Sequence, residues 1–295
     1  MLLLLATTLS RGEEASPHVA FLQSAGFKIH PMGDGGFSID FPEPKAFDAA
    51  TLDHIAALGD VRRLSGNGEG IDDTVLARLA KAAPALEYVF INGSALSDAG
   101  LAALATLPAL KHFGLHHGPK ELKGKGLLAL KGNKHFTSIE FGGMASIDDE
   151  TVGYLAQLPQ LRSVNIYHTL NTRTSLPLLV QKLPLLESFA LNPHFEPTRF
   201  SAADIAALSP LKNLRELALN DLVLPYENGL IHLKALTGLK KLSVEWSFYT
   251  DEDLARLRAA LPGVEIKAGN RAADDKPALW NERVEEMNKA ATKRP

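Results

Sequence analysis

Histidines cluster in this chain of 295 residues, and imidazole is the commonest metal ligand among side chains. His112, His116 and His117 lie close together, and His168 follows further along. Metal ligands must stand about 2 Å from one ion. On an extended strand, His112 and His116 would be about 13 Å apart, and the neighbours His116 and His117 would point to opposite faces. The spacing therefore predicts no metal, and we expect no other cofactor.

The sequence lacks residues that other catalytic and nucleotide-binding motifs require. The run Gly66-Asn67-Gly68-Glu69-Gly70 imitates a phosphate-binding loop, but the Lys and Ser/Thr of such a loop are missing, so it indicates a flexible turn. The chain has no cysteine, which excludes disulfides, thiolate metal sites and cysteine nucleophiles. It also lacks a Gly-x-Ser-x-Gly elbow and recurring carboxylate pairs. These absences predict that the protein is not an enzyme.

Composition limits the class of partner. Hydrophobic residues make up 45% and charged residues 22% of the chain, and the formal net charge is -3. Nucleic-acid binding favours a basic stripe, so we expect no nucleic-acid partner. No stretch after the first residues reaches the roughly 18 apolar residues of a membrane span, so we expect no transmembrane segment in the mature chain.

The first residues predict export. Leu2 to Leu5 form part of an apolar run within Met1 to Ser10, and Arg11 begins a polar segment. This length suits the apolar region of a signal peptide, although no basic residue precedes it and the cleavage signal is weak. We interpret residues 1–15 as a candidate signal peptide that sends the protein to the periplasm or outside the cell. The alternative is a frayed apolar terminus on a cytoplasmic protein.

An apolar sextet, Leu-x-x-Leu-x-Leu with other apolar residues allowed, recurs along most of the chain at separations of 24 to 28 residues. The sextets begin at Gly36, Val61, Leu86, Leu110, Phe136, Leu161, Leu186, Leu214, Leu239 and Val264. Such a register is typical of a solenoid. Within each sextet the apolar residues alternate, as at Val89 and Ile91, which predicts a short strand with one face toward a core.

A second recurring signal predicts helix starts about ten residues after each strand. A Ser, Thr or Asp stands between two apolar residues, as in Leu96, Ser97 and Leu101, which matches an N-cap flanked by a hydrophobic staple. The predicted caps are Asp48, Asp72, Ser97, Asp148, Ser201 and Thr250. Because every unit runs in the same direction, the strands must pair in parallel, with the helices as crossovers.

These units resemble bacterial leucine-rich repeat proteins over about Gly36 to Ile266. Leu107-Pro108-Ala109-Leu110 and Ser97-Asp98 match the subtype with a Thr/Ser-Asp-x-x-Leu signature, whereas the Asn ladder of other subtypes is absent. The resemblance implies an α/β horseshoe with a parallel sheet on the concave face and short helices on the convex face. It also implies a binding module, although a fold does not fix a function.

The organisation of the chain follows from these patterns. Residues 16–35 predict an N-terminal cap made of a capped helix over His18 to Ala25 and a strand over Phe27 to His30. Residues 36–266 form about nine to ten repeats, with extra residues bulging from one rim at Asn192 to Phe200. Residues 267–295 predict a polar linker and a C-terminal helix. That helix folds over the last repeat, binds a partner separately, or is disordered.

Side chains between the apolar positions of each strand must line the concave surface. Aromatic and hydrogen-bonding residues gather on neighbouring strands there, a combination enriched in the centres of interfaces. The candidate partner-binding residues are Tyr88, Phe90, Asn92, His112, His116, Glu140, Asn165 and Tyr167. Isolated exposed aromatic residues are also common without any function.

Three classes of function remain open. The first is a non-catalytic module that binds an unknown protein, either extracellular or in the cell envelope, on the concave sheet. The alternative is an exported protein that binds carbohydrate or the cell envelope, with Tyr88, Tyr167 and Trp246 stacking on sugar rings. An enzyme is the least favoured, because it would need titratable residues clustered in a deep pocket.

Overall fold

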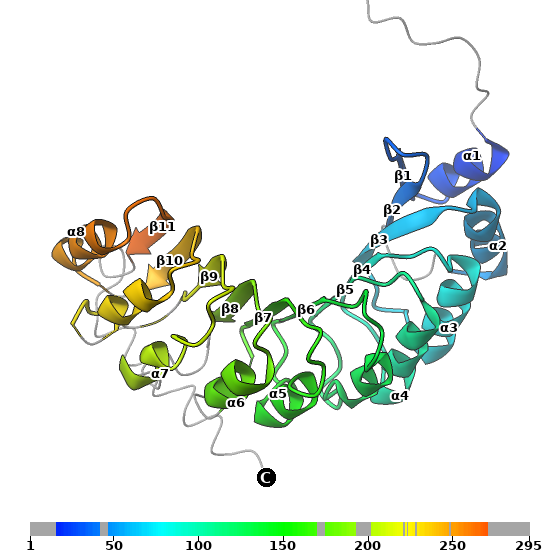
Figure 1. Cartoon of the computed structure of the whole chain (residues 1–295). Coiled ribbons are helices and arrows are strands. Elements are labelled where there is room, and N and C mark those ends of the chain that lie inside the picture. Colours follow the sequence, from blue (N-terminus) through cyan, green and yellow to red (C-terminus); the bar gives the residue numbers. More distant parts are fainter. Residues whose placement is uncertain are drawn as a thin grey trace, which may run out of the picture.

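The protein forms an arc of stacked strand and helix units. The computed structural model describes residues 16–41, 47–169, 175–192, 202–220, 222, 224–227, 229–247 and 249–270. In Figure 1 the strands follow the inner side of the arc and the helices follow its outer side, from α1 at one end to α8 at the other. This arrangement confirms the predicted α/β leucine-rich repeat solenoid.

One sheet runs through the whole arc, and its strands pair in the order of the sequence. The strands are β1 Lys28–Pro31, β2 Phe37–Phe41, β3 Val61–Asn67, β4 Tyr88–Asn92, β5 His112–His116, β6 Ser138–Gly142, β7 Ser163–Tyr167, β8 Ser188–Asn192, β9 Glu216–Ala218, β10 Lys241–Ser247 and β11 Glu265–Asn270. Strands β2 to β11 correspond to the ten predicted sextets and pair in parallel. Strand β1 pairs antiparallel with β2 and covers the first repeat.

Short helices connect the strands on the convex side. The α-helices are α1 Pro17–Ser24, α2 Ala49–Leu58, α3 Asp73–Ala82, α4 Asp98–Leu101, α5 Asp149–Leu155, α6 Ser175–Lys182, α7 Ala202–Ala206 and α8 Asp251–Ala260. The 3₁₀ helices are Ala102–Thr106, Lys125–Leu130 and Leu230–Ala235. These tighter turns cross the arc in repeats where other units of similar length use an α-helix.

The predicted N-caps of the repeats are confirmed wherever the structure describes them. Side chains of five caps accept hydrogen bonds from amides in the first turn of their helices, which satisfies donors that a helix start leaves free. These caps are Asp48, Asp72, Ser97, Asp148 and Thr250. Ser201 lies outside the described residues. The predicted cap of the first helix is wrong, because Ser16 makes no side-chain capping bond, although Pro17 occupies the first turn of α1.

Apolar residues of the sextets fill the space between the sheet and the helices. Val89 and Ile91 of β4 are both 0% exposed, as are Phe113 and Leu115 of β5. Burying such a side chain stabilises the fold by roughly 1.5–3 kcal/mol. Each repeat adds its own layer, so the core is a continuous strip along the arc rather than a central ball.

Paired residues at the helix starts also join neighbouring repeats. Asp72 caps α3 by accepting the amide N–H of Val75 at 2.8 Å. The next residue, Asp73, accepts the amide N–H of Ser97 at 2.8 Å and the Ser97 hydroxyl at 2.5 Å, both from the following repeat. The second residue of the pair therefore stabilises the next helix start instead of its own.

The following repeat uses the same device. Asp98 accepts the amide N–H of Lys123 at 3.0 Å and that of Gly126 at 3.2 Å. Gly100 fits closely against Asp73, because a Cβ there would lie 1.9 Å from an Asp73 carboxylate oxygen. Asp73, Asp98 and Gly100 thus have a physical role in stacking the repeats.

One turn after the strand is left-handed at the same place in several repeats. The residue five positions after the first residue of β4, β5, β6, β7 and β10 has a positive φ, between 49° and 76°. These residues are Gly93, His117, Gly143, His168 and Trp246. Glycine adopts this conformation without steric cost, whereas most other residues do not.

Several sequence-based expectations lie outside the described residues. These are the candidate signal peptide in residues 1–15, the rim insertion after Asn192 and the C-terminal helix. The predicted first strand begins one residue later than expected, at Lys28. Within the described ranges, no helix combines the length and the apolar character that crossing a membrane requires.

Candidate binding surface on the concave sheet

The parallel register places concave side chains of successive strands in rows across the sheet. Tyr88 is paired with His112, which is paired in turn with Ser138, and the next concave row aligns Phe90, Gly114 and Glu140. The concave residues of β4 to β7 therefore contact one another although they are far apart in sequence. All eight predicted partner-binding residues lie on these four strands, and all are partly exposed.

A stack of three side chains begins this surface. The Arg63 guanidinium lies 4.1 Å from the ring centroid of Tyr88. The Tyr88 ring in turn stacks on His112, with centroids 4.3 Å apart and an interplanar angle of 8°. Nδ1 of His112 lies 2.8 Å from the Ser138 hydroxyl. Burial, reinforced by the charge of Arg63, lowers the pKa of His112 from 6.5 to about 4, so the ring is neutral at pH 7.

Next to this stack, four polar side chains form a hydrogen-bonded network. Nε2 of His116 lies 2.7 Å from a carboxylate oxygen of Glu140 and 2.5 Å from the Tyr167 hydroxyl. The Asn165 amide donates to the other Glu140 oxygen at 3.3 Å. Because β6 lies between the strands of His116 and Tyr167, this contact requires a residue without a side chain at Gly142.

Electrostatics fix the protonation of two members of this network. Burial opposes ionisation of Glu140, but hydrogen bonds from His116 and Asn165 and the nearby imidazoles outweigh it and lower the carboxyl pKa. Burial, together with the Glu140 charge and hydrogen bond, raises the pKa of Tyr167. At neutral pH Glu140 is therefore a carboxylate and Tyr167 is a neutral phenol.

The remaining predicted residues extend the network to both sides. The Phe90 ring contacts His116 edge to face, with centroids 4.6 Å apart. Asn92 donates to Asn67 at 3.0 Å, and its carbonyl oxygen lies 2.8 Å from Nδ1 of His117. The rings of Tyr88, Phe90, His112, His116 and Tyr167 are called the aromatic cluster below.

The expectation that His116 and His117 point to opposite faces is wrong. Their ring centroids are 6.2 Å apart, because the left-handed turn at His117 ends the alternation of the strand. This approach does not create a metal centre by itself. Among the described residues, no group of three or more His, Asp or Glu side chains is placed to hold a metal ion.

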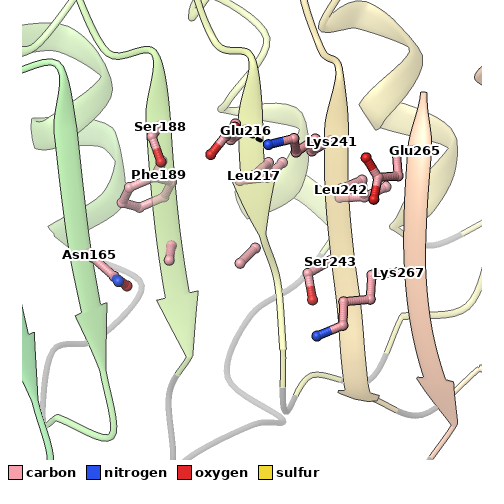
Figure 2. Close-up of a pocket in the computed structure, with 12 residues that line it drawn as sticks. Asn165, Ser188, Phe189, Glu216, Leu217, Lys241, Leu242, Ser243, Glu265 and Lys267 are labelled. Carbon is pink, nitrogen blue, oxygen red and sulfur yellow. Dashed lines mark hydrogen bonds and ion pairs between the residues drawn. The ribbon is translucent and has the colours of Figure 1, made fainter. Parts of the chain in front are cut away.

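A shallow trough of about 300 Å³ lies beside the cluster, over β7 to β11. Small side chains form its floor, and charged ones form its far side. Lining residues include Asn165, Ser188, Ala190, Ala218, Ser243 and Lys267. Figure 2 shows the ion pair of Lys241 with Glu216 at this trough, where their charged atoms are 2.8 Å apart.

Sequence reasoning missed three contributors to this surface. Arg63 on β3 contacts Tyr88, Ser138 on β6 contacts His112, and Gly142 makes room for the contact between Tyr167 and His116. The sequence could have indicated the role of Gly142, because this glycine lies inside a predicted strand and the neighbouring strands carry large concave side chains. The trough had a similar signal in the small residues of β8 and β9.

Comparisons with known proteins bear on the fold. The sequence matches no protein-family model and no curated protein. A chain of the Rad7 and Elc1 complex from yeast has a TM-score of 0.58 at 17% identity, covering 83% of this chain and 66% of that one. A Bacteroides fragilis protein has a TM-score of 0.51 at 16% identity, with coverages of 74% and 69%.

An internalin from Listeria monocytogenes has a TM-score of 0.49 at 20% identity, and the match covers 75% of this chain but only 56% of the internalin. Identities this low bear on architecture and not on activity. The regular sextets, the parallel sheet, the convex helices and the two solved structures with higher scores agree on one architecture. The chain therefore has the fold of a leucine-rich repeat solenoid.

Proposed function

We propose that this protein is a non-catalytic module that binds a polypeptide partner on its concave sheet, centred on the aromatic cluster. The observation that carries the proposal is that five partly exposed rings lie on one face of three strands in two contacting groups, Tyr88 against His112, and Phe90 and Tyr167 against His116. A few residues carry most of the binding energy of a protein interface, and tyrosines such as Tyr88 and Tyr167 are enriched among them.

The contacts within the cluster also reduce the cost of binding. Ordering a flexible side chain at an interface costs about 0.5–1.5 kcal/mol. Tyr88 is already held between Arg63 and His112, and Tyr167 is held by His116 and Glu140. A partner that covers these rings would not have to immobilise them. The adjacent trough would accept side chains that project from the partner.

The resolved pKa shifts argue against catalysis at this surface. A general acid or base works best with a pKa near the operating pH. Here the pKa of Tyr167 is raised, that of Glu140 is lowered, and that of His112 is lowered to about 4. All three shifts move the pKa of the group further from pH 7. They stabilise one protonation state of the surface, which suits recognition better than proton transfer.

Carbohydrate binding is the second candidate, and Trp246 favours it because this residue is 57% exposed. Tyr88 counts against it. Stacking on a sugar requires an open ring face, but Arg63 covers one face of Tyr88 and His112 the other. Polypeptide binding therefore accounts for more of the concave surface, and sugar binding becomes an outcome of the experiment.

The experiment is a capture assay with the purified chain, tested against extracellular and envelope fractions of the source cells and against a glycan array. Tyr88→Ala with Tyr167→Ala should abolish capture of a polypeptide, whereas Leu185→Ala, at an exposed leucine outside the cluster, should not. Urea unfolding of each variant separates lost binding from lost folding. Equal capture by a folded double variant, or capture of glycans alone, would contradict the proposal.

Export from a bacterial cell is part of the same proposal and rests on the apolar run at Leu2 to Leu5. Edman sequencing of the native protein, recovered separately from cytosol and envelope, tests it. A cleaved N-terminus in the exported fraction is expected. Recovery from the cytosol alone, with Met1 to Ser10 intact, would contradict export but not the concave binding site.

A further inference from the structure

Trp246 combines two unusual properties at the end of β10. The residue is 57% exposed, and its backbone φ is 57°, in the left-handed region. Bulky residues rarely adopt this conformation, because the Cβ crowds the neighbouring carbonyl. Strained conformations persist where the surrounding structure imposes them, and they concentrate at functional sites.

Hydrogen bonds on both sides of Trp246 hold this turn. The register of β10 with β11 shifts between Val244 and Ser247, which marks a bulge that contains Trp246. The buried Ser247 hydroxyl donates to the carbonyl oxygen of Leu219 at 3.0 Å and accepts the amide of Leu222 at 3.2 Å. Bulges commonly redirect a side chain. Here the bonds come from Ser247, so the turn does not depend on the indole.

Equivalent turns show what the backbone alone requires. Gly93 and Gly143 occupy the same place after β4 and β6. His117 and His168 occupy it after β5 and β7, and histidine tolerates the left-handed region better than most residues. Glycine would satisfy the turn at position 246 as well. Among the described residues, neither the turn nor the core accounts for a tryptophan at this position, which points to a contact with a partner.

The surroundings of Trp246 indicate the chemistry of that contact. Its neighbour Glu245 is paired with Lys267 at 2.9 Å. Asn220 accepts the Ser243 hydroxyl at 2.8 Å and the Glu245 amide at 2.9 Å. A sugar would need polar groups free to bind its hydroxyls, and these are already engaged. An apolar side chain needs only the indole face.

Resting on the proposed function, we propose that Trp246 is a second anchor for the same polypeptide partner, which covers the indole with an aliphatic or aromatic side chain. Five strand spacings separate β5, in the aromatic cluster, from β10, which corresponds to about 24 Å. A standard interface of about 800 Å² per partner has this width. One folded partner of that size can therefore span the distance between the two places.

The test uses a defined probe. A library of random peptides displayed on phage is panned against the full chain, and the Kd of the recovered peptide is measured by fluorescence anisotropy. Trp246→Gly should weaken binding at least tenfold while the urea midpoint stays equal or rises, because glycine relieves the left-handed strain. Leu185→Ala, at the other exposed large apolar residue among those described, should change neither quantity.

Fluorescence adds a readout at the residue itself. The chain has two tryptophans, so Trp280→Phe leaves Trp246 as the only indole. Its emission should move to shorter wavelength when the peptide binds, because the indole leaves water.

The possible results separate the two proposals. Unchanged peptide affinity of Trp246→Gly would overturn the second anchor, and a lower urea midpoint would show that the indole stabilises the fold instead. A peptide that loses affinity for Tyr88→Ala with Tyr167→Ala but not for Trp246→Gly would leave the proposed function standing. Enrichment of no peptide, or binding of glycans only, would contradict both.

Discussion

Tyr167 and His116 meet above Gly142, with the phenol oxygen 2.5 Å from Nε2 of the imidazole. The two residues come from β7 and β5, and β6 passes between them. A Cβ at position 142 would lie 2.7 Å from Cζ of Tyr167 and 2.9 Å from Cδ2 of His116. The absence of one side chain therefore permits a contact across three strands.

Gly142→Ala should separate Tyr167 from His116. We expect the free energy of unfolding to fall by about 1–3 kcal/mol, as overpacking typically costs, and binding of the partner peptide to weaken. Gly153→Ala is the matched control, because a Cβ there in α5 meets no atom within 4 Å. It should leave stability unchanged or raise it by about 0.4–1 kcal/mol. Urea unfolding measures both, and equal effects of the two changes would contradict the packing argument.

Acid should destabilise the protein through His112. Burial holds the folded pKa at about 4, against 6.5 for the free side chain. Between these values the unfolded chain binds a proton that the folded chain does not, so the free energy of unfolding falls as the pH falls. The loss should reach about 2 kcal/mol, allowing for partial exposure.

Urea unfolding of the wild type and His112→Phe at pH 7 and pH 4 isolates this effect, because the phenyl ring keeps the stacking but does not titrate. The variant should lose less stability on acidification, whereas His135→Gln, at an exposed histidine, should behave as the wild type does. Parallel pH profiles for wild type and His112→Phe would show that His112 titrates normally.

Asp73→Ala should weaken the connection between two repeats. It removes the acceptor for both the amide and the hydroxyl of Ser97. The expected loss of stability is about 1–3 kcal/mol, because each hydrogen bond to a carboxylate contributes about that much. Asp53→Ala, at an exposed position in α2, serves as the control and should change stability by less than about 0.5 kcal/mol. If the two changes have the same effect in urea, the inter-repeat bonds contribute nothing.

Ser247→Ala should loosen the bulge that carries Trp246. The Ser247 side chain is fully buried, and its loss leaves the amide of Leu222 and the carbonyl of Leu219 without this partner. An unsatisfied buried group costs about 1–3 kcal/mol. Amide hydrogen exchange at Leu222 should become faster, and Ser163→Ala, at a half-exposed serine of β7, should not change it. If the Leu222 amide is equally protected from exchange in the variant, Ser247 does not support the turn.

The strands and most helix starts could be predicted from sequence because they depend on local patterns. The apolar residues Val89 and Ile91 occupy alternate positions, which indicates a strand with one buried face. Asp72 indicates a helix start, because its side chain can accept an amide that the first turn leaves free. Both signals arise within a few residues, so they need no knowledge of the rest of the chain. The repeat then extends one correct unit to the whole fold.

The details of the candidate site depend on register between strands, which a single sequence does not show. The eight predicted residues do share one face, but Gly142 becomes meaningful only when it lies between His116 and Tyr167. The alternation rule also fails at His117, because it holds only while the backbone stays extended. Partner binding by these residues remains a prediction.

The pairing of every strand with the next one in sequence also bears on how the chain folds. Parallel partners are separated by as few as 23 residues, at Ser247 and Asn270, and by as many as 28, at Ser188 and Glu216. These separations are short for a parallel sheet in a chain of 295 residues. Folding rates rise as the mean separation of contacts falls relative to chain length. The chain can therefore nucleate at any adjacent pair of repeats and grow outward, adding one layer at a time.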